Sequence, residues 1–166
     1  MTQNFTRRDM VKTSAAIAGG CWLGTSANQA AAASSNDKLN IAVVGIGGRG
    51  RANLNALGGE NIVALCDVDE QRAGNAYEKF PKAKKFTDFR RMFDAMDKQI
   101  DAVVVSTPDH THFHPSMAAM ELGKHLYCEK PMAHTVEETR RMTDMAAKSK
   151  VATQLGVQRH TIDNVH

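Results

Sequence analysis

The sequence has few cysteines, few aromatic residues and no long hydrophobic run. Its three cysteines, Cys21, Cys66 and Cys128, lie far apart, and no C-x-x-C spacing occurs. That absence excludes a zinc ribbon and a thioredoxin-type redox motif. Cys66 and Cys128 each lie at the end of an apolar run, so we expect two buried free thiols, although an exported compartment permits a disulfide. The apolar stretch near the amino terminus is too short and too rich in glycine to span a bilayer by itself.

Residues 1–33 have the features of an export signal. Paired Arg7 and Arg8 precede a mildly apolar, glycine-rich stretch, and small residues of the A-x-A type follow. This order of regions resembles a twin-arginine signal, which predicts export in folded form to the periplasm through the twin-arginine machinery. The alternatives are a disordered basic tail and a lipid anchor at Cys21, for which "AGGC" is a poor motif. Residues 34–37 are then a linker.

The chain also has little net charge once residues 1–33 are left out. The whole sequence has a net charge of +3, but residues 1–33 hold three of the 21 basic and one of the 18 acidic residues. The remainder is almost neutral, which gives no electrostatic reason to expect nucleic acid or an anionic membrane as a partner. An apolar content of 42% and a charged content of 23% are typical of a soluble globular domain.

From Lys38 onward, apolar runs alternate with helical patterns. The runs are continuous, which is typical of parallel strands buried on both faces. The alternation predicts an α/β fold, a doubly wound Rossmann sheet of about six strands that binds its ligand at the carboxyl ends, near the switch between strands 1 and 4. Thr135 and Glu138 predict a capping box. We expect strands in 39–47, 61–69, 83–89, 100–109, 125–131 and 151–158, and helices in 49–57, 70–80, 89–98, 114–124 and 135–150.

The stretch "VVGIGGRG" places Gly45, Gly47 and Gly50 between the first strand and the first helix. A lone G-x-G-x-x-G is weak evidence, but here it has the context that a dinucleotide site requires. The first glycine allows the tight turn, the second lets a pyrophosphate approach, and the third lets the helix pack close to the strand. Amides at the helix start then bind phosphate oxygens, and Arg49 adds a charge.

An acidic residue is expected about twenty positions further on, at the end of the second strand. Asp67 meets this requirement. A carboxylate there accepts hydrogen bonds from the ribose diol and repels a 2′-phosphate, so NAD is favoured over NADP. Two alternatives stay open at this stage: Asp67 only caps the next helix, or Arg72 accommodates NADP.

Three histidines, His110, His112 and His114, follow the fourth strand. Alternating histidines share a face only on a strand, and these come after Pro108, where the chain turns into a helix. No carboxylate or cysteine cluster accompanies them, so we expect no metal site. One histidine is expected to bond the cofactor's sugar, and the others to pack or to face solvent.

The fifth strand ends in "YCEKP", again at the predicted ligand edge. Pro131 restricts the local backbone. A lysine at this position, Lys130, is suited to stabilise an alkoxide or to pass a proton. Without further context, Glu129 and Lys130 are equally consistent with a surface ion pair.

Taken together, "GIGGRG", "CDVD", "STPDHTH" and "GKHLYCEKPMAHTVEE" resemble the amino-terminal domain of the glucose–fructose oxidoreductase, inositol dehydrogenase and rhizopine-catabolism family (Gfo/Idh/MocA). The resemblance covers Lys38 to His160, so the dinucleotide domain is assigned to 38–160. It implies a Rossmann domain that binds NAD or NADP and a following α/β domain that binds a sugar-like substrate. It implies a cofactor site of Gly45, Ile46, Gly47, Gly48, Arg49, Gly50, Asp67, Thr107, Pro108, His112, Glu129, Lys130 and Gln158, with Lys130 also catalytic.

The family's second domain is expected to be missing, with residues 161–166 as its beginning. The resemblance thus implies an NAD(P)-dependent oxidoreductase that transfers hydride between nicotinamide and a hydroxyl carbon of a sugar or sugar derivative, and it implies that the 166-residue chain alone is nearly inactive. The alternatives are an NAD-dependent glycosidase of the same family, working by oxidation and elimination, and a non-catalytic nucleotide-binding fragment. A homo-oligomer is a possibility for the full-length form.

Overall fold

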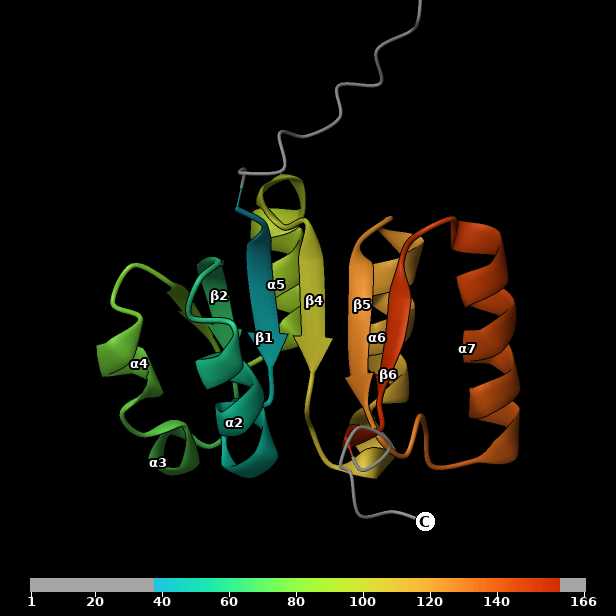
Figure 1. Ribbon diagram of the computed structural model, residues 1–166, viewed down its shortest axis with the longest axis horizontal. Helices are drawn as coiled ribbons and strands as arrows, with labels where there is room; N and C mark the ends of the chain where they lie inside the picture. Colours follow the sequence, from blue (N-terminus) through green and yellow to red (C-terminus); the bar gives the residue numbers. More distant parts are fainter. Residues whose placement is uncertain (1–37, 159–166) are drawn as a thin grey trace, which may run out of the picture. The chain divides into compact units, whose positions relative to one another are not determined.

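The computed structural model describes residues 38–158, so the predicted export signal, the linker and residues 161–166 lie outside the described residues. Its sheet is parallel and has the order β3-β2-β1-β4-β5-β6 (Figure 1). The predicted Rossmann architecture is therefore confirmed. The strands are β1 (Asn40–Val44), β2 (Asn61–Cys66), β3 (Lys84–Phe86), β4 (Ala102–Val105), β5 (His125–Glu129) and β6 (Thr153–Gly156).

Six helices connect the strands, and two short 3₁₀ turns, Asp97–Gln99 and Asp109–Thr111, accompany them in the described part of the chain. The predicted capping box at the last helix is confirmed: Thr135 accepts from the amide of Glu138, whose carboxylate accepts from the amide of Thr135. The helices are α2 (Gly48–Ala56), α3 (Glu70–Ala73), α4 (Ala76–Lys79), α5 (Phe89–Met96), α6 (Phe113–Glu121) and α7 (Val136–Ser149).

The prediction of a single helix over residues 70–80 was wrong. Gly74 has φ +47° and ψ −131°, which is not a helical conformation, and it separates α3 from α4. The guanidinium of Arg51 donates to the carbonyl oxygens of Arg72 and Ala73, 2.7 and 3.0 Å away, at this break. These long-range bonds satisfy the carbonyls that a continuous helix would have used.

Alternate strand residues bury their side chains on opposite faces of the sheet. On one face Ala42, Val44, Val103 and Val105 pack with side chains of α5, α6 and α7. On the other face Ile41, Val43, Leu65 and Val104 pack with side chains of α2, α3 and α4. This is why the strands are apolar at consecutive positions, as a parallel sheet covered on both sides requires.

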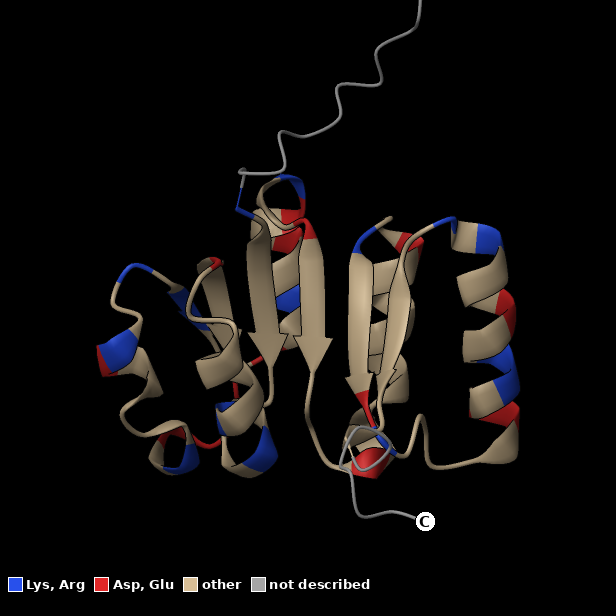
Figure 2. Ribbon diagram, in the orientation of Figure 1, with Lys and Arg blue, Asp and Glu red and all other residues tan. Residues whose placement is uncertain are grey.

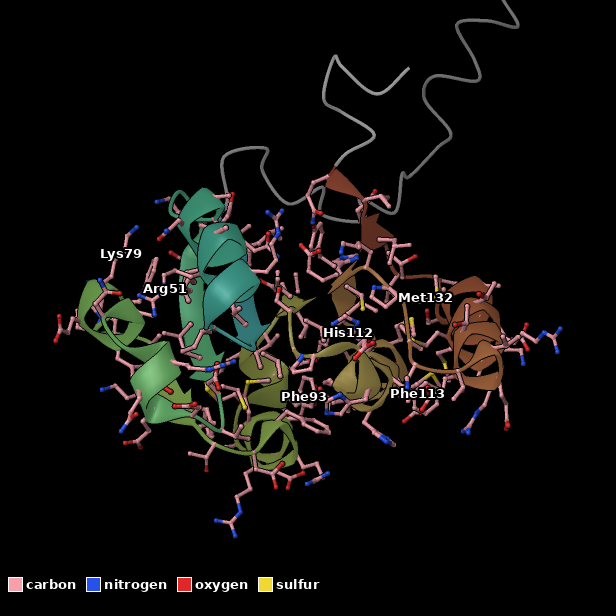
Figure 3. All side chains as sticks on the ribbon, turned by 90° about the horizontal axis from the view of Figure 1, so that it is seen from below. Arg51, Lys79, Phe93, His112, Phe113 and Met132 are labelled. Carbon is pink, nitrogen blue, oxygen red and sulfur yellow. The ribbon has the colours of Figure 1, made fainter. Side chains whose placement is uncertain are left out.

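The chain reverses its direction of travel across the sheet between β1 and β4. Strands β2 and β3 extend from β1 on one side, and β4 pairs with β1 on the other. The loops after β1 and β4 therefore meet at the switch point of the carboxyl edge, which is where open α/β sheets bind ligands. Figure 3 views the domain from this edge, toward which the strand arrows of Figure 1 point.

Cys66 and Cys128 are buried and free, as expected, and lie on β2 and β5, which are not neighbours. Burial raises the pKa of the Cys66 thiol to about 12 and that of Cys128 to about 11, with nearby carboxylates adding to the rise. Both thiols therefore stay protonated and unreactive at neutral pH.

Acidic and basic residues alternate along α7 (Figure 2). In residues 38–158, no helix is long and apolar enough to cross a membrane. Within the same residues, no group of three histidine, cysteine or acidic side chains is arranged to hold a metal ion.

Candidate dinucleotide site

The turn between β1 and α2 packs against the end of β4 so closely that two of its positions have room only for glycine. Gly45 has φ +82°, and a Cβ there would lie 2.7 Å from the backbone of Ser106 and Thr107. A Cβ on Gly50 would lie 1.9 Å from the carbonyl oxygen of Gly45. The first and third glycines of the motif thus bring α2 directly onto the turn, as a dinucleotide loop requires.

The amino terminus of α2 is open for an anion. Gly47 is its N-cap residue, and no side chain caps the helix. The amides of Gly48 and Arg49 have no acceptor among the described residues. A Cβ on Gly48 would meet nothing within 4 Å, so the approach to these amides is clear. Free amides and the helix dipole together fit the pyrophosphate of a dinucleotide.

Asp67 follows β2 and reaches back to the glycine turn. Its Oδ2 accepts from the amides of Ile46 and Gly47, at 2.8 and 3.2 Å, and its Oδ1 accepts from the amide of Asp69 at 3.0 Å. Asp67 is therefore more than a helix cap: it fixes the conformation of the loop that would receive the dinucleotide. The sequence placed Asp67 near the ribose but contained no signal for its bonds to the loop.

Glu129, at the end of β5, is the centre of a second cluster. Its side chain is 5% exposed. Its Oε1 accepts from Arg49 Nε at 3.1 Å, from Asn53 Nδ2 at 2.8 Å, and also from Gln158. Burial by itself raises the pKa of Glu129, but the hydrogen bonds from Asn53, Gln158 and Arg49 together outweigh it and hold that pKa below its usual range. Glu129 is therefore ionised at neutral pH.

The cluster around Glu129 connects the glycine helix to the far side of the switch point. Arg49 and Asn53 belong to α2, whereas Gln158 follows β6. Asn53 also donates to the hydroxyl of Ser106, 2.9 Å away, at the end of β4. Tyr127 of β5 donates to the same carboxylate oxygen at 3.3 Å. Asn53 and Tyr127 were missed in the sequence, because neither belongs to a recognisable motif.

Lys130 lies directly after this fixed carboxylate. Its side chain is exposed at the carboxyl edge, and no hydrogen bond or ion pair engages its amine within the described residues. The peptide bond to Pro131 is cis. Among the described residues Glu129 and Lys130 therefore form no ion pair: the carboxylate is buried and bound to Arg49, while Lys130 is exposed.

The three histidines after β4 separate instead of forming a cluster. His112 is buried, with its ring nitrogens 2.6 Å from the carbonyl oxygens of Thr107 and Pro131. His110 is exposed and lies 3.6 Å from Asp109. The ring of His114 is exposed and packs edge-on against a phenylalanine. The hydroxyl of Thr107 is buried without a partner in the described residues.

The structure thus gathers most of the predicted site residues at one edge, in two hydrogen-bonded groups and a connecting histidine. A hollow of about 510 Å³ lies away from them, at the amino ends of the strands, lined by Asn40, Asn61, Phe80 and Lys84 among others. The first group is Gly45, Ile46, Gly47, Gly50 and Asp67; the second is Arg49, Glu129 and Gln158; Thr107 and His112 connect the loops, while Gly48, Pro108 and Lys130 are exposed.

Comparison with known proteins places this geometry in a family. A family model described as an oxidoreductase family with an NAD-binding Rossmann fold matches residues 39–157. The chain is 31% identical over 127 residues to inositol 2-dehydrogenase of Salmonella paratyphi B, covering 73% of this chain and 37% of that protein. It is 32% identical over 123 residues to levoglucosan dehydrogenase of Pseudarthrobacter phenanthrenivorans, covering 68% and 31%. It is 33% identical over 150 residues to a glycosyl hydrolase family 109 protein of Solibacter usitatus, covering 80% and 34%.

Solved structures agree with these matches. The WlbA dehydrogenase of Chromobacterium violaceum, in complex with NADH and UDP-GlcNAcA, superposes with a TM-score of 0.69 at 26% identity, covering 76% of this chain and 37% of that one. The myo-inositol 2-dehydrogenase of Lactobacillus plantarum superposes with a TM-score of 0.70 at 25% identity, covering 76% and 38%. The chain spans about 37% of the length of the first curated relatives that it matches.

Proposed function

The chain belongs to the Gfo/Idh/MocA family of oxidoreductases, and on this basis we propose that it binds NAD and serves hydride transfer at a hydroxyl carbon of a sugar or sugar derivative. The named dehydrogenases among its relatives act, by their names, on inositol and levoglucosan. They support a polyhydroxylated, sugar-like substrate. They also favour a dehydrogenase over the glycosidase alternative.

The observation that carries the proposal is the open amino terminus of α2 beside Asp67. The free amides of Gly48 and Arg49 fit the pyrophosphate. Asp67 stands at the end of β2, where its carboxylate accepts hydrogen bonds from a ribose diol and repels a 2′-phosphate. Arg72 lies next to Gly47 and has only a loose ion pair with Asp69, at 3.7 Å, so its side chain is the one local argument for NADP.

Lys130 is the residue that we assign to the substrate. When bound, NAD supplies a hydride acceptor. A hydroxyl carbon that gives up a hydride must also release its hydroxyl proton. Lys130 is exposed at the carboxyl edge and its amine is unengaged, and in its neutral form this amine would accept that proton. Glu129 keeps this part of the backbone in place through its bonds to α2, while its charge is neutralised by Arg49.

Calorimetric titration of the purified chain with NAD and with NADP tests the cofactor. We expect saturable NAD binding at a tighter dissociation constant than for NADP. In Arg72→Ala the preference for NAD should persist, because Asp67 and not Arg72 sets it. Tighter binding of NADP to the unmodified chain would contradict the assignment of Asp67.

Steady-state kinetics tests the reaction, in a form of the protein that also carries a substrate domain of the family. With cyclitols and sugars as substrates, Lys130→Met should lower turnover by about 10²–10⁴-fold, the usual contribution of a general base, while NAD binding changes little. Net formation of NADH marks a dehydrogenase, and turnover of a glycoside without net NADH marks the glycosidase. Near-normal turnover in Lys130→Met would move the proton transfer to another residue.

Export is a separate proposal, which rests on the sequence of residues 1–33 alone. We propose that the twin-arginine machinery delivers the folded protein, with its cofactor, to the periplasm, and that the signal is cleaved near Ala33. Replacing Arg7 and Arg8 with lysine should retain the protein in the cytoplasm. Unchanged export of that variant, or a lipid on Cys21 of the exported protein, would refute the proposal.

A further inference from the structure

A buried histidine connects the loop after β4 to the loop after β5, in which Lys130 lies. His112 precedes α6, and its side chain is 1% exposed. Its Nε2 lies 2.6 Å from the carbonyl oxygen of Thr107, in the loop after β4, and its Nδ1 lies 2.6 Å from that of Pro131, in the loop after β5. Figure 3 shows His112 near the middle of the domain, seen from the carboxyl edge.

Both partners of the ring are carbonyl oxygens, which accept hydrogen bonds and cannot donate them. A ring nitrogen without a proton would direct its lone pair at an oxygen lone pair only 2.6 Å away, without access to water. Each contact is therefore a hydrogen bond only when that nitrogen carries a proton. The Pro131 contact is thus a hydrogen bond when Nδ1 carries the proton, and the Thr107 contact is one when Nε2 carries it.

Lys130 is the residue that this arrangement leaves between two fixed neighbours. On its amino-terminal side, Glu129 is held by Arg49 and Asn53. On its carboxyl-terminal side, the carbonyl of Pro131 is held by His112. The amine of Lys130 is itself unengaged within residues 38–158, so the direction of its side chain depends on where these neighbours hold the backbone.

We propose that His112 is a positioning residue for Lys130, acting through the hydrogen bond from its Nδ1 to the carbonyl of Pro131. From the sequence, one of the three histidines is expected to bond the cofactor's sugar, and the family resemblance places His112 in the cofactor site. Its two ring nitrogens are already occupied by backbone carbonyls, so in this structure it has no donor left for a sugar. The proposal rests on the proposed function, because Lys130 matters only if it serves the substrate.

Two substitutions separate the two bonds of the ring. In His112→Asn the side-chain nitrogen takes the place of Nδ1 and keeps the Pro131 bond. In His112→Gln it takes the place of Nε2 and keeps the Thr107 bond. A general stabilising role predicts that both variants disturb the loop alike, whereas positioning through Pro131 predicts that they differ.

The experiment is NMR of the 166-residue chain labelled with ¹³C and ¹⁵N. In the unmodified protein we expect a proton on Nδ1 of His112 and a scalar coupling across the hydrogen bond to the carbonyl carbon of Pro131. We expect the amide signals of Lys130 and Met132 to stay in place in His112→Asn and to move in His112→Gln, at comparable melting temperatures. The same samples are titrated with NAD, so failure of the unmodified chain to bind NAD refutes the proposed function and leaves the hydrogen-bond result standing.

Two results would overturn the inference. One is an Nδ1 without a proton in the unmodified protein, which removes the Pro131 bond and needs no variant to fold. The other is that the Lys130 and Met132 amide signals move equally in both variants, or that they move in neither variant. In either case His112 would only fill space behind the loops.

Discussion

Replacing Asp67 with alanine should lower both the free energy of unfolding and the affinity for NAD, and the two effects can be measured separately. In the cofactor-free protein the carboxylate accepts three backbone amides, those of Ile46, Gly47 and Asp69. Hydrogen bonds to a charged group are worth about 1.5–3 kcal/mol each. Because Asp67 is half-buried, we count only its two bonds to the glycine turn, at the low end of that range, and expect the free energy of unfolding to fall by about 3 kcal/mol in Asp67→Ala.

Asp67→Asn is the matched control. Its side-chain oxygen can still accept from Ile46 and Gly47, while its amide group faces the amide of Asp69, so we expect a loss of about 1 kcal/mol. Urea unfolding without cofactor measures both variants, and calorimetry measures NAD binding. We expect Asp67→Ala to bind NAD at least about tenfold more weakly, because both the ribose contact and the loop conformation are lost. If Asp67→Ala unfolds within about 0.5 kcal/mol of the unmodified protein, the carboxylate does not hold the loop.

Three further results are expected. Gly50→Ala should lower the free energy of unfolding by about 1–3 kcal/mol, because its Cβ would lie 1.9 Å from a backbone oxygen. Gly59→Ala is the control: a Cβ there meets nothing within 4 Å, so the change should be neutral or slightly stabilising. Equal urea midpoints for the two variants would contradict the close packing of α2. Cys66 and Cys128 should react with a disulfide reagent only after unfolding, since they are buried and their thiol pKa values are about 12 and 11. The test uses a variant with Cys21→Ser. Prompt reaction of this variant in its folded state would show that the two thiols are accessible. The pKa of Glu129 is lowered in the folded state, so its contribution to stability is present above its ordinary pKa of 4.5 and is lost as the pH falls through the folded pKa. In Glu129→Gln the stability should therefore fall less on acidification, as measured by urea unfolding across that pH range. An unchanged dependence of stability on acid pH would contradict the role of the cluster.

Much of the dinucleotide loop could be predicted from the sequence, because its requirements are local. Gly45, Gly47 and Gly50 lie within a single turn, where Gly45 and Gly50 allow the close packing and Gly47 is the N-cap of α2. The capping box of Thr135 and Glu138 is likewise complete within four residues. The single helix expected over 70–80 failed for the opposite reason, because Gly74 and a distant arginine decide it.

The sequence by itself determined the order of the elements, their burial on both faces and the glycine turn, since these depend on neighbouring residues and on periodicity. Only the tertiary structure decided which groups meet at the carboxyl edge. Asp67 reaches Ile46 across 21 positions, Arg49 reaches Glu129 across 80, and His112 reaches Pro131 across 19. These bonds exist because β1 lies between β2 and β4, with β5 beyond β4, so loops far apart in the chain end side by side.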